Sequence, residues 1–215
     1  VRFKNGDITV PLTAARDKAQ PQEGLTMATI VLFHSALGLT DGVRRFAAAL
    51  SADGDTVLTP DLFDGTTFST IEQGVQKRDA LGIPELMRRA SAAAELSPPD
   101  SIFAGFSMGA AAAQYLALSR PGARALVLMH AVLPLAALGA EPWPPVPVQI
   151  HASEGDPWVD DLVVADFART SAATVFRYPG KGHLFAEPGQ ADFDAASAEL
   201  LQRRVRDFLR PVSRR

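Results

Sequence analysis

From Thr29 onward, short apolar runs rich in β-branched residues alternate with longer helix-like stretches. This alternation is typical of a parallel sheet with helices on both faces, because parallel strands need long crossover connections. The six candidate strands are TIVLFH, TVLTP, SIFAGF, ALVLMHA, VPVQIHA and ATVFRYP. The candidate helices begin near Asp41, Pro84, Ser107, Val159 and Asp192. Asp41 and Asp192 are well placed to cap their helices. The sequence therefore predicts an α/β fold with a mostly parallel, doubly wound sheet.

The composition is that of one globular domain, with 215 residues, 47% of them hydrophobic and 21% charged. A net charge of -3 offers no basic surface for nucleic acid, and the absence of cysteine excludes disulfides and thiolate chemistry. The longest uncharged runs are shorter than the roughly 20 apolar residues of a membrane span. We expect no nucleic-acid partner, no membrane association and a cytoplasmic location, and the sequence leaves the oligomeric state open.

Residues 1–26 fit the alternating pattern poorly, because they are polar and rich in turn residues, and they carry charges where an export signal would be apolar. Met27 opens directly into the first candidate strand. Two interpretations have equal weight: a lead-in that is not native, with Met27 as the natural start, or an edge hairpin formed by DITVPL. The predicted α/β domain occupies residues 27–215 in either case.

The segment GFSMG, residues 105–109, places a serine between two glycines. A nucleophile elbow needs small residues two positions before and after its nucleophile, because the strand-to-helix turn is too tight for larger side chains. Ser107 follows the third candidate strand and opens an alanine-rich helix. The motif and its context together predict Ser107 as a catalytic nucleophile.

A serine nucleophile needs a base and an acid, which in this architecture follow in the chain order serine, acid, histidine. His183 is the only histidine that follows a later candidate strand and leaves room for an acid, whereas His130 and His151 fit satisfied core positions. The segment after VPVQIHA offers four carboxylates: Glu154, Asp156, Asp160 and Asp161. We predict Asp156, because it lies in the turn itself, whereas Asp160 and Asp161 fall in the first turn of the next helix.

An acyl-transfer site also needs donors for the oxyanion of the tetrahedral intermediate. The backbone N–H of Met108 is the first, and the loop FHSALG after the first strand supplies the second, with Ala36 as the predicted donor. The residues predicted to line the substrate pocket are Leu37, Phe63, Met108, Trp158, Leu184 and Phe185. Without a long cap insertion the pocket is predicted to be shallow and to favour small acyl groups. No cofactor or metal is required.

Four blocks together resemble the dienelactone hydrolase family of α/β-hydrolases: VLFHSALGLTDGVRRFAAALSADGDTVLTPDLFDG, GFSMGA, SEGDPWVD and GHLF. The resemblance covers most of the chain from Met27. It implies an α/β-hydrolase fold without a large cap domain. It also implies Ser107, Asp156 and His183 at the triad positions, with the backbones of Ala36 and Met108 at the oxyanion hole.

Three departures from the family pattern bear on the chemistry. The best-known members have cysteine at the position of Ser107, and a glutamate that interacts with that thiol near the position of Ser35. Serine at both positions indicates an ordinary serine esterase mechanism. Characteristic members also hold a substrate carboxylate with arginines, one of them four residues after the catalytic histidine, where this chain has Glu187. We expect Glu187 to repel such a carboxylate, although Arg78 is a candidate for a second arginine.

These observations predict a carboxylic ester hydrolase that works through an acyl-enzyme on small neutral esters or lactones. The same triad also fits an acyltransferase or another acyl-bond hydrolase. A non-catalytic ligand-binding protein with a hydrolase fold remains an alternative of another class, because fold does not fix function.

Overall fold

The computed structural model describes residues 27–139 and 142–214. The prediction for residues 1–26 therefore lies outside the described residues. The elements follow in the order β1 (Thr29–Phe33), α1 (Asp41–Ser51), β2 (Thr56–Leu58), α2 (Ile71–Leu81), α3 (Ile83–Ala94), β3 (Ile102–Phe106), α4 (Met108–Ser119), β4 (Ala125–Met129), η1 (Leu135–Leu138), β5 (Val148–Ser153), α5 (Asp161–Ser171), β6 (Thr174–Tyr178) and α6 (Ala195–Ser213).

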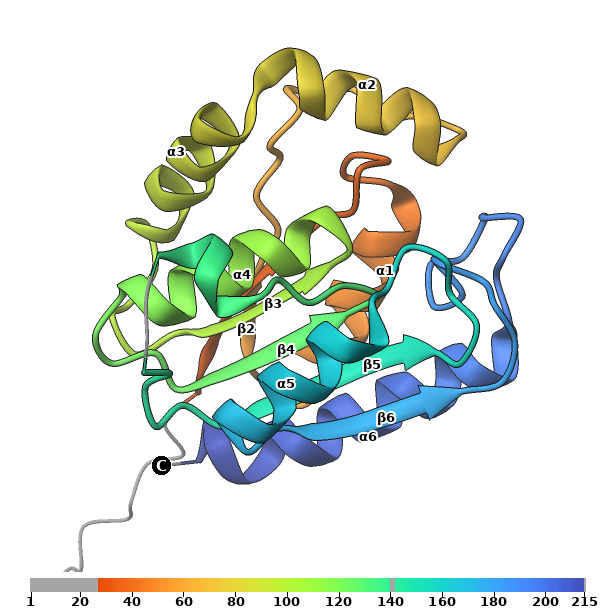
Figure 1. Cartoon of the computed structure of the whole chain (residues 1–215). Helices are drawn as coiled ribbons and strands as arrows, with labels where there is room; N and C mark the ends of the chain where they lie inside the picture. The colour runs from red at the N-terminus through yellow and green to blue at the C-terminus, as the bar shows by residue number, and fades with distance from the viewer. Residues whose placement is uncertain (1–26, 140–141, 215) are drawn as a thin grey trace, which may run out of the picture.

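All six predicted strands form one parallel sheet in the order β2-β1-β3-β4-β5-β6 (Figure 1). The central register places Phe103 of β3 between Val31 of β1 and Leu126 of β4. The chain winds outward in one direction from β1 to β2 and in the other from β3 to β6, which confirms the predicted doubly wound α/β fold. Because all strands are parallel, the segments that follow them meet at one edge of the sheet.

The two faces of the sheet bury two separate hydrophobic cores. Val31 and Phe33 point toward the face covered by α3, α4 and α5, whereas Ile30 and Leu32 point toward α1 and α6 (Figure 1). This division follows from the period of two along a strand. Because helices cover both faces, the central strands are apolar at nearly every position.

Two predicted helix caps are wrong. The cap of α1 is Thr40, and Asp41 is the first helical residue. The cap of α6 is Asp194, whereas Asp192 accepts a hydrogen bond from the backbone N–H of His183 at 3.0 Å. In both places, neighbouring residues have suitable cap chemistry, and the path of the loop selects one of them.

The helix α2 was not predicted. It begins within the segment Thr70-Ile71-Glu72-Gln73, which has the pattern of a capping box. The Thr70 hydroxyl caps the helix by accepting a hydrogen bond from the Gln73 N–H. Together α2 and α3 stand above α4 without forming a large cap domain (Figure 1). None of the helices in the described ranges combines the length and apolar character that a membrane span requires.

Candidate active site

Ser107 occupies the turn between β3 and α4 with φ 50° and ψ -111°. A non-glycine residue with positive φ is strained, and such strain is typical of a nucleophile elbow. A Cβ atom on Gly105 would lie 2.1 Å from the Gly109 carbonyl oxygen, and one on Gly109 would lie 2.4 Å from the Phe33 carbonyl oxygen. Both glycines of the motif are therefore required by close backbone contacts.

The structure brings together the three residues predicted as a triad. The Ser107 hydroxyl lies 2.8 Å from His183 Nε2, and His183 Nδ1 lies 2.7 Å from Asp156 Oδ2. The Asp156 and His183 side chains are 0% and 4% exposed. A proton on Nδ1 is donated to the Asp156 carboxylate, which leaves Nε2 free to accept the serine proton.

Backbone and side-chain contacts hold Asp156 and His183 in place. Asp156 Oδ1 accepts from the Trp158 N–H at 2.9 Å. The Ser153 hydroxyl donates to the Gly182 carbonyl at 2.6 Å, which together with the Asp192 bond fixes both polar groups of the peptide unit between Gly182 and His183. Sequence reasoning missed Ser153 and Asp192, because no motif marks a side chain that supports a loop distant in sequence.

The two predicted oxyanion donors lie in different segments, Met108 at the start of α4 and Ala36 in the loop between β1 and α1. The N–H groups of Ala36 and Met108 donate to no other group among the described residues. A Cβ on Gly109 would also lie 2.5 Å from the His34 carbonyl oxygen, so the start of α4 is in contact with the loop that carries Ala36. This proximity permits both N–H groups to serve one oxyanion.

A cavity of about 520 Å³ opens onto Ser107 and His183. Its walls are mostly apolar side chains of α3, α4 and the β4–η1 segment: Leu86, Met87, Ala111, Tyr115, Leu133 and Leu138. This volume falls within the usual range of small-molecule sites. The α2–α3 pair forms one wall of this cavity, which the sequence pattern did not reveal, and the shallowness of the pocket stays a prediction.

Of the residues predicted to line the pocket, Met108 and Trp158 do so. The other four are buried elsewhere, and these are Leu37, Phe63, Leu184 and Phe185. Phe63 belongs to the core on the α3–α5 face, whereas Phe185 packs against Tyr178 on the other face. The prediction failed because it assumed that every loop at the strand ends faces the cavity.

Glu187 also lies away from the cavity. Its side chain is buried, and its carboxylate accepts hydrogen bonds from Ser35 and Thr40. The predicted repulsion of a substrate carboxylate by Glu187 therefore has no structural basis. Arg78 of α2 does line the cavity, where its guanidinium pairs with Asp79 at 2.7 Å.

Two other histidines are buried in the sheet region. His151 is a satisfied core residue as predicted, bonded to Tyr178 and Gln149. His130 is buried too, but both of its ring nitrogens lack a partner among the described residues, contrary to expectation. Within the same residues, no three His, Asp or Glu side chains gather as a metal site would require.

Solved structures with the same fold include three hydrolases. A dienelactone hydrolase-like promiscuous phosphotriesterase from metagenomic libraries has 22% identity and a TM-score of 0.71, with 86% of each chain covered. The dienelactone hydrolase of Anabaena variabilis has 21% identity and a TM-score of 0.64 over 86% of this chain and 87% of that one. Esterase PE8 has 17% identity and a TM-score of 0.59 over 86% and 94%.

No curated protein matches this chain. The model of the dienelactone hydrolase family matches residues 15–213, a range that contains the elbow and both of its partners. The chain belongs to the dienelactone hydrolase family.

Proposed function

We propose that this protein is a carboxylic ester hydrolase with Ser107 as its nucleophile. The observation that carries the proposal is the continuous hydrogen-bonded chain from Ser107 through His183 to Asp156, built on a strained elbow. Membership of the dienelactone hydrolase family supports hydrolase chemistry. Two proteins of similar fold, esterase PE8 and the phosphotriesterase, are named for the hydrolysis of esters, which also supports the proposal.

The reaction proceeds in two halves. His183 Nε2 takes the proton of Ser107 as the serine oxygen attacks the ester carbonyl, and the Ala36 and Met108 N–H groups bind the oxyanion. The imidazolium, stabilised by Asp156, then protonates the departing alkoxide and leaves an acyl-enzyme. In the second half, His183 removes a proton from water as the water oxygen attacks the acyl carbonyl. The His183 imidazolium then gives that proton to the Ser107 oxygen as the acid is released.

The cavity supports neutral esters or lactones with an apolar acyl group as substrates. Arg78 carries the only permanent charge among the described residues that line it, and Asp79 offsets that charge. The volume of about 520 Å³ extends the proposed range from small acyl groups to those of medium length.

Two other functions use the same fold, and neither is favoured by a specific contact. Acyl transfer to an alcohol would give ester products when an acceptor alcohol competes with water. A binding protein would show no turnover, although such proteins commonly lose a triad member and here all three positions are filled.

Hydrolysis of p-nitrophenyl esters of increasing acyl length tests the proposal. Replacing Ser107 with alanine should lower kcat by at least about 10⁴-fold, because the base then has no nucleophile to activate. Ser119→Ala is the matched control, since Ser119 is exposed at the other end of α4. Similar rates in the two variants would reject Ser107 as the nucleophile.

A further inference from the structure

The Glu187 carboxylate is buried in the protein, at 1% exposure of the residue, and lies outside the proposed triad. Two hydroxyl groups donate to it: Ser35 Oγ to Oε2 at 3.0 Å and Thr40 Oγ1 to Oε1 at 2.6 Å. No described cation pairs with it. Burial raises the pKa of Glu187, and the two hydroxyl donors oppose that rise. A buried carboxylate without a cation is unfavourable unless hydrogen bonds satisfy it, so these two hydroxyls are what make the arrangement possible.

Both hydroxyls connect the carboxylate to the backbone of another segment. Ser35 Oγ also accepts from the Leu37 N–H at 3.2 Å, and Thr40 Oγ1 accepts from the Val43 N–H at the start of α1 at 3.3 Å. The chain of bonds from Glu187 therefore fixes the residues on both sides of Ala36, whose N–H is the proposed oxyanion donor.

Close packing confines this loop from two directions. A Cβ atom on Gly42 of α1 would lie 3.0 Å from Glu187 Cγ, so the glycine lets Glu187 approach the helix closely. On the other side, a Cβ on Gly74 of α2 would lie 1.9 Å from the Ala36 carbonyl oxygen. The loop that carries Ala36 is thus held between α2 and the residues bonded to Glu187.

Glu187 is also attached to the loop of the catalytic base. It lies four residues after His183, and its backbone N–H donates to the Leu184 carbonyl at 2.9 Å in the intervening turn. One side chain therefore joins the segment of the proposed base to the segment of the proposed oxyanion hole. It does so without lining the substrate cavity.

We propose that Glu187 is a positioning residue that sets the place of the Ala36 N–H relative to Ser107 and His183. This inference rests on the proposed esterase function. Its effect falls on the transition state, because the oxyanion forms only there, and substrate binding in the cavity is left unchanged.

Two substitutions of Glu187 test the proposal on a neutral p-nitrophenyl ester. Glu187→Ala removes both acceptors, frees the loop, and should lower kcat by about 10²-fold with KM within about twofold, the scale of a small misplacement. Glu187→Gln keeps the shape and one carbonyl acceptor, and its NH₂ group donates to the other hydroxyl. We expect Glu187→Gln to recover most of the wild-type kcat.

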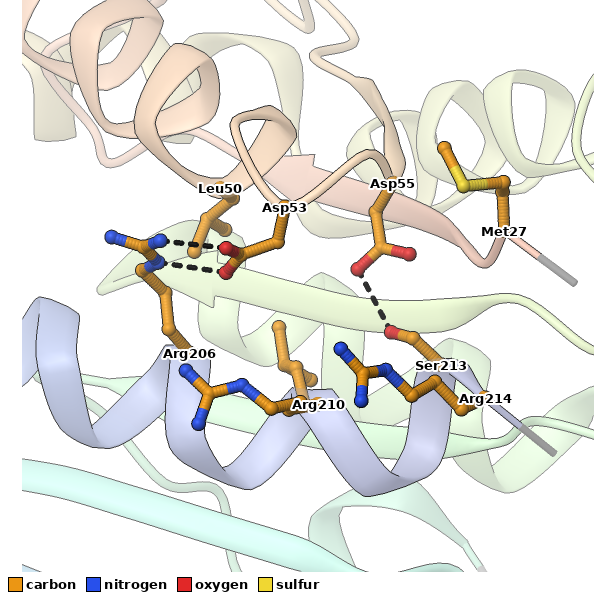
Figure 2. A pocket seen from close by; sticks show the side chains of 9 residues that line it. Met27, Leu50, Asp53, Asp55, Arg206, Arg210, Ser213 and Arg214 are labelled. Atoms are coloured by element: carbon orange, nitrogen blue, oxygen red, sulfur yellow. Dashed lines mark hydrogen bonds and ion pairs between the residues drawn. The ribbon is translucent and has the colours of Figure 1, made fainter. Parts of the chain in front are cut away.

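Asp55 provides a matched control directly before β2, at the amino end of the strands, and Figure 2 shows its bond to Ser213. Its carboxylate also accepts two hydrogen bonds, from the Ala28 N–H at 3.0 Å and from the Ser213 hydroxyl at 2.8 Å. The hollow beside it is only about 30 Å³, so no substrate site is disturbed. Asp55→Ala should lower the Tm and leave kcat within about twofold of wild type, because its contacts support only the fold.

The outcomes separate the proposal from its alternatives. A kcat of Glu187→Ala equal to that of Asp55→Ala, a loss confined to KM, or a Gln variant as slow as the Ala variant would overturn the positioning role. If Glu187→Ala does not fold, Ser35→Ala removes the bond to the same loop, and its kcat decides the question in the same way. Failure of the esterase proposal shows differently, as no ester turnover by the wild-type protein or as full activity in Ser107→Ala.

Discussion

The buried His151 makes the stability of this protein sensitive to acid. Its Nδ1 lies 2.7 Å from the Tyr178 hydroxyl, and its Nε2 lies 2.8 Å from Gln149 Oε1. Burial and, to a smaller extent, the Arg204 guanidinium nearby lower the pKa of His151 to about 3. The folded protein therefore keeps this ring neutral at pH values where an exposed histidine takes up a proton.

The sign and size of the effect follow from that difference. With the folded pKa depressed, the contribution of His151 to stability is complete above the unfolded value of about 6.5 and is lost as the pH falls toward 3. Between pH 7 and pH 5, protonation of the unfolded chain at this one position lowers the free energy of unfolding by about 2 kcal/mol.

Urea unfolding of wild type and His151→Gln at pH 7 and pH 5 measures this contribution. The variant is less stable at both pH values, but it should lose about 2 kcal/mol less than wild type between them. His34 and His130 are buried with lowered pKa values too, and their contributions cancel because both proteins keep them. Equal losses in the two proteins would refute the argument.

Three further expectations concern the site. His183→Ala should lower kcat by at least about 10³-fold, because Ser107 then has no base to accept its proton, and a variant that keeps most of the wild-type activity would contradict this. Ala111→Phe should reduce kcat/KM for an octanoate ester about 10-fold more than for an acetate ester, since it fills the cavity, and equal losses would place the acyl chain elsewhere. Gly105→Ala should lower the Tm and abolish turnover because its Cβ would meet the Gly109 carbonyl, and wild-type activity would show that the elbow can shift.

The sheet and the elbow could be predicted because their sequence signals are local. Each strand is a short apolar run, the chain order of serine, acid and histidine selects His183, and its place in the turn after the strand selects Asp156 from four carboxylates. The two glycines around Ser107 report backbone contacts that no other residue permits. Such signals need no knowledge of what packs against them.

The cavity and the environment of Glu187 depend on tertiary packing and could not be predicted. The helix α2 has few apolar residues, so its sequence lacks an amphipathic pattern. Its contact with the loop that carries Ala36 is made through a glycine, Gly74. Glu187 follows His183 by four residues, but the turn between them directs its side chain toward Ser35 and Thr40. Its direction follows from the loop path and not from its position in the sequence.

The central claim is that ester turnover passes through a covalent bond at Ser107. Treating the protein with a fluorophosphonate and mapping the adduct by peptide mass spectrometry tests it most directly, because the reagent reacts with an activated serine. The account predicts one phosphonyl group per chain, located on Ser107, with ester hydrolysis lost in proportion to labelling. An adduct on another residue, or full activity in a fully labelled protein, would contradict it.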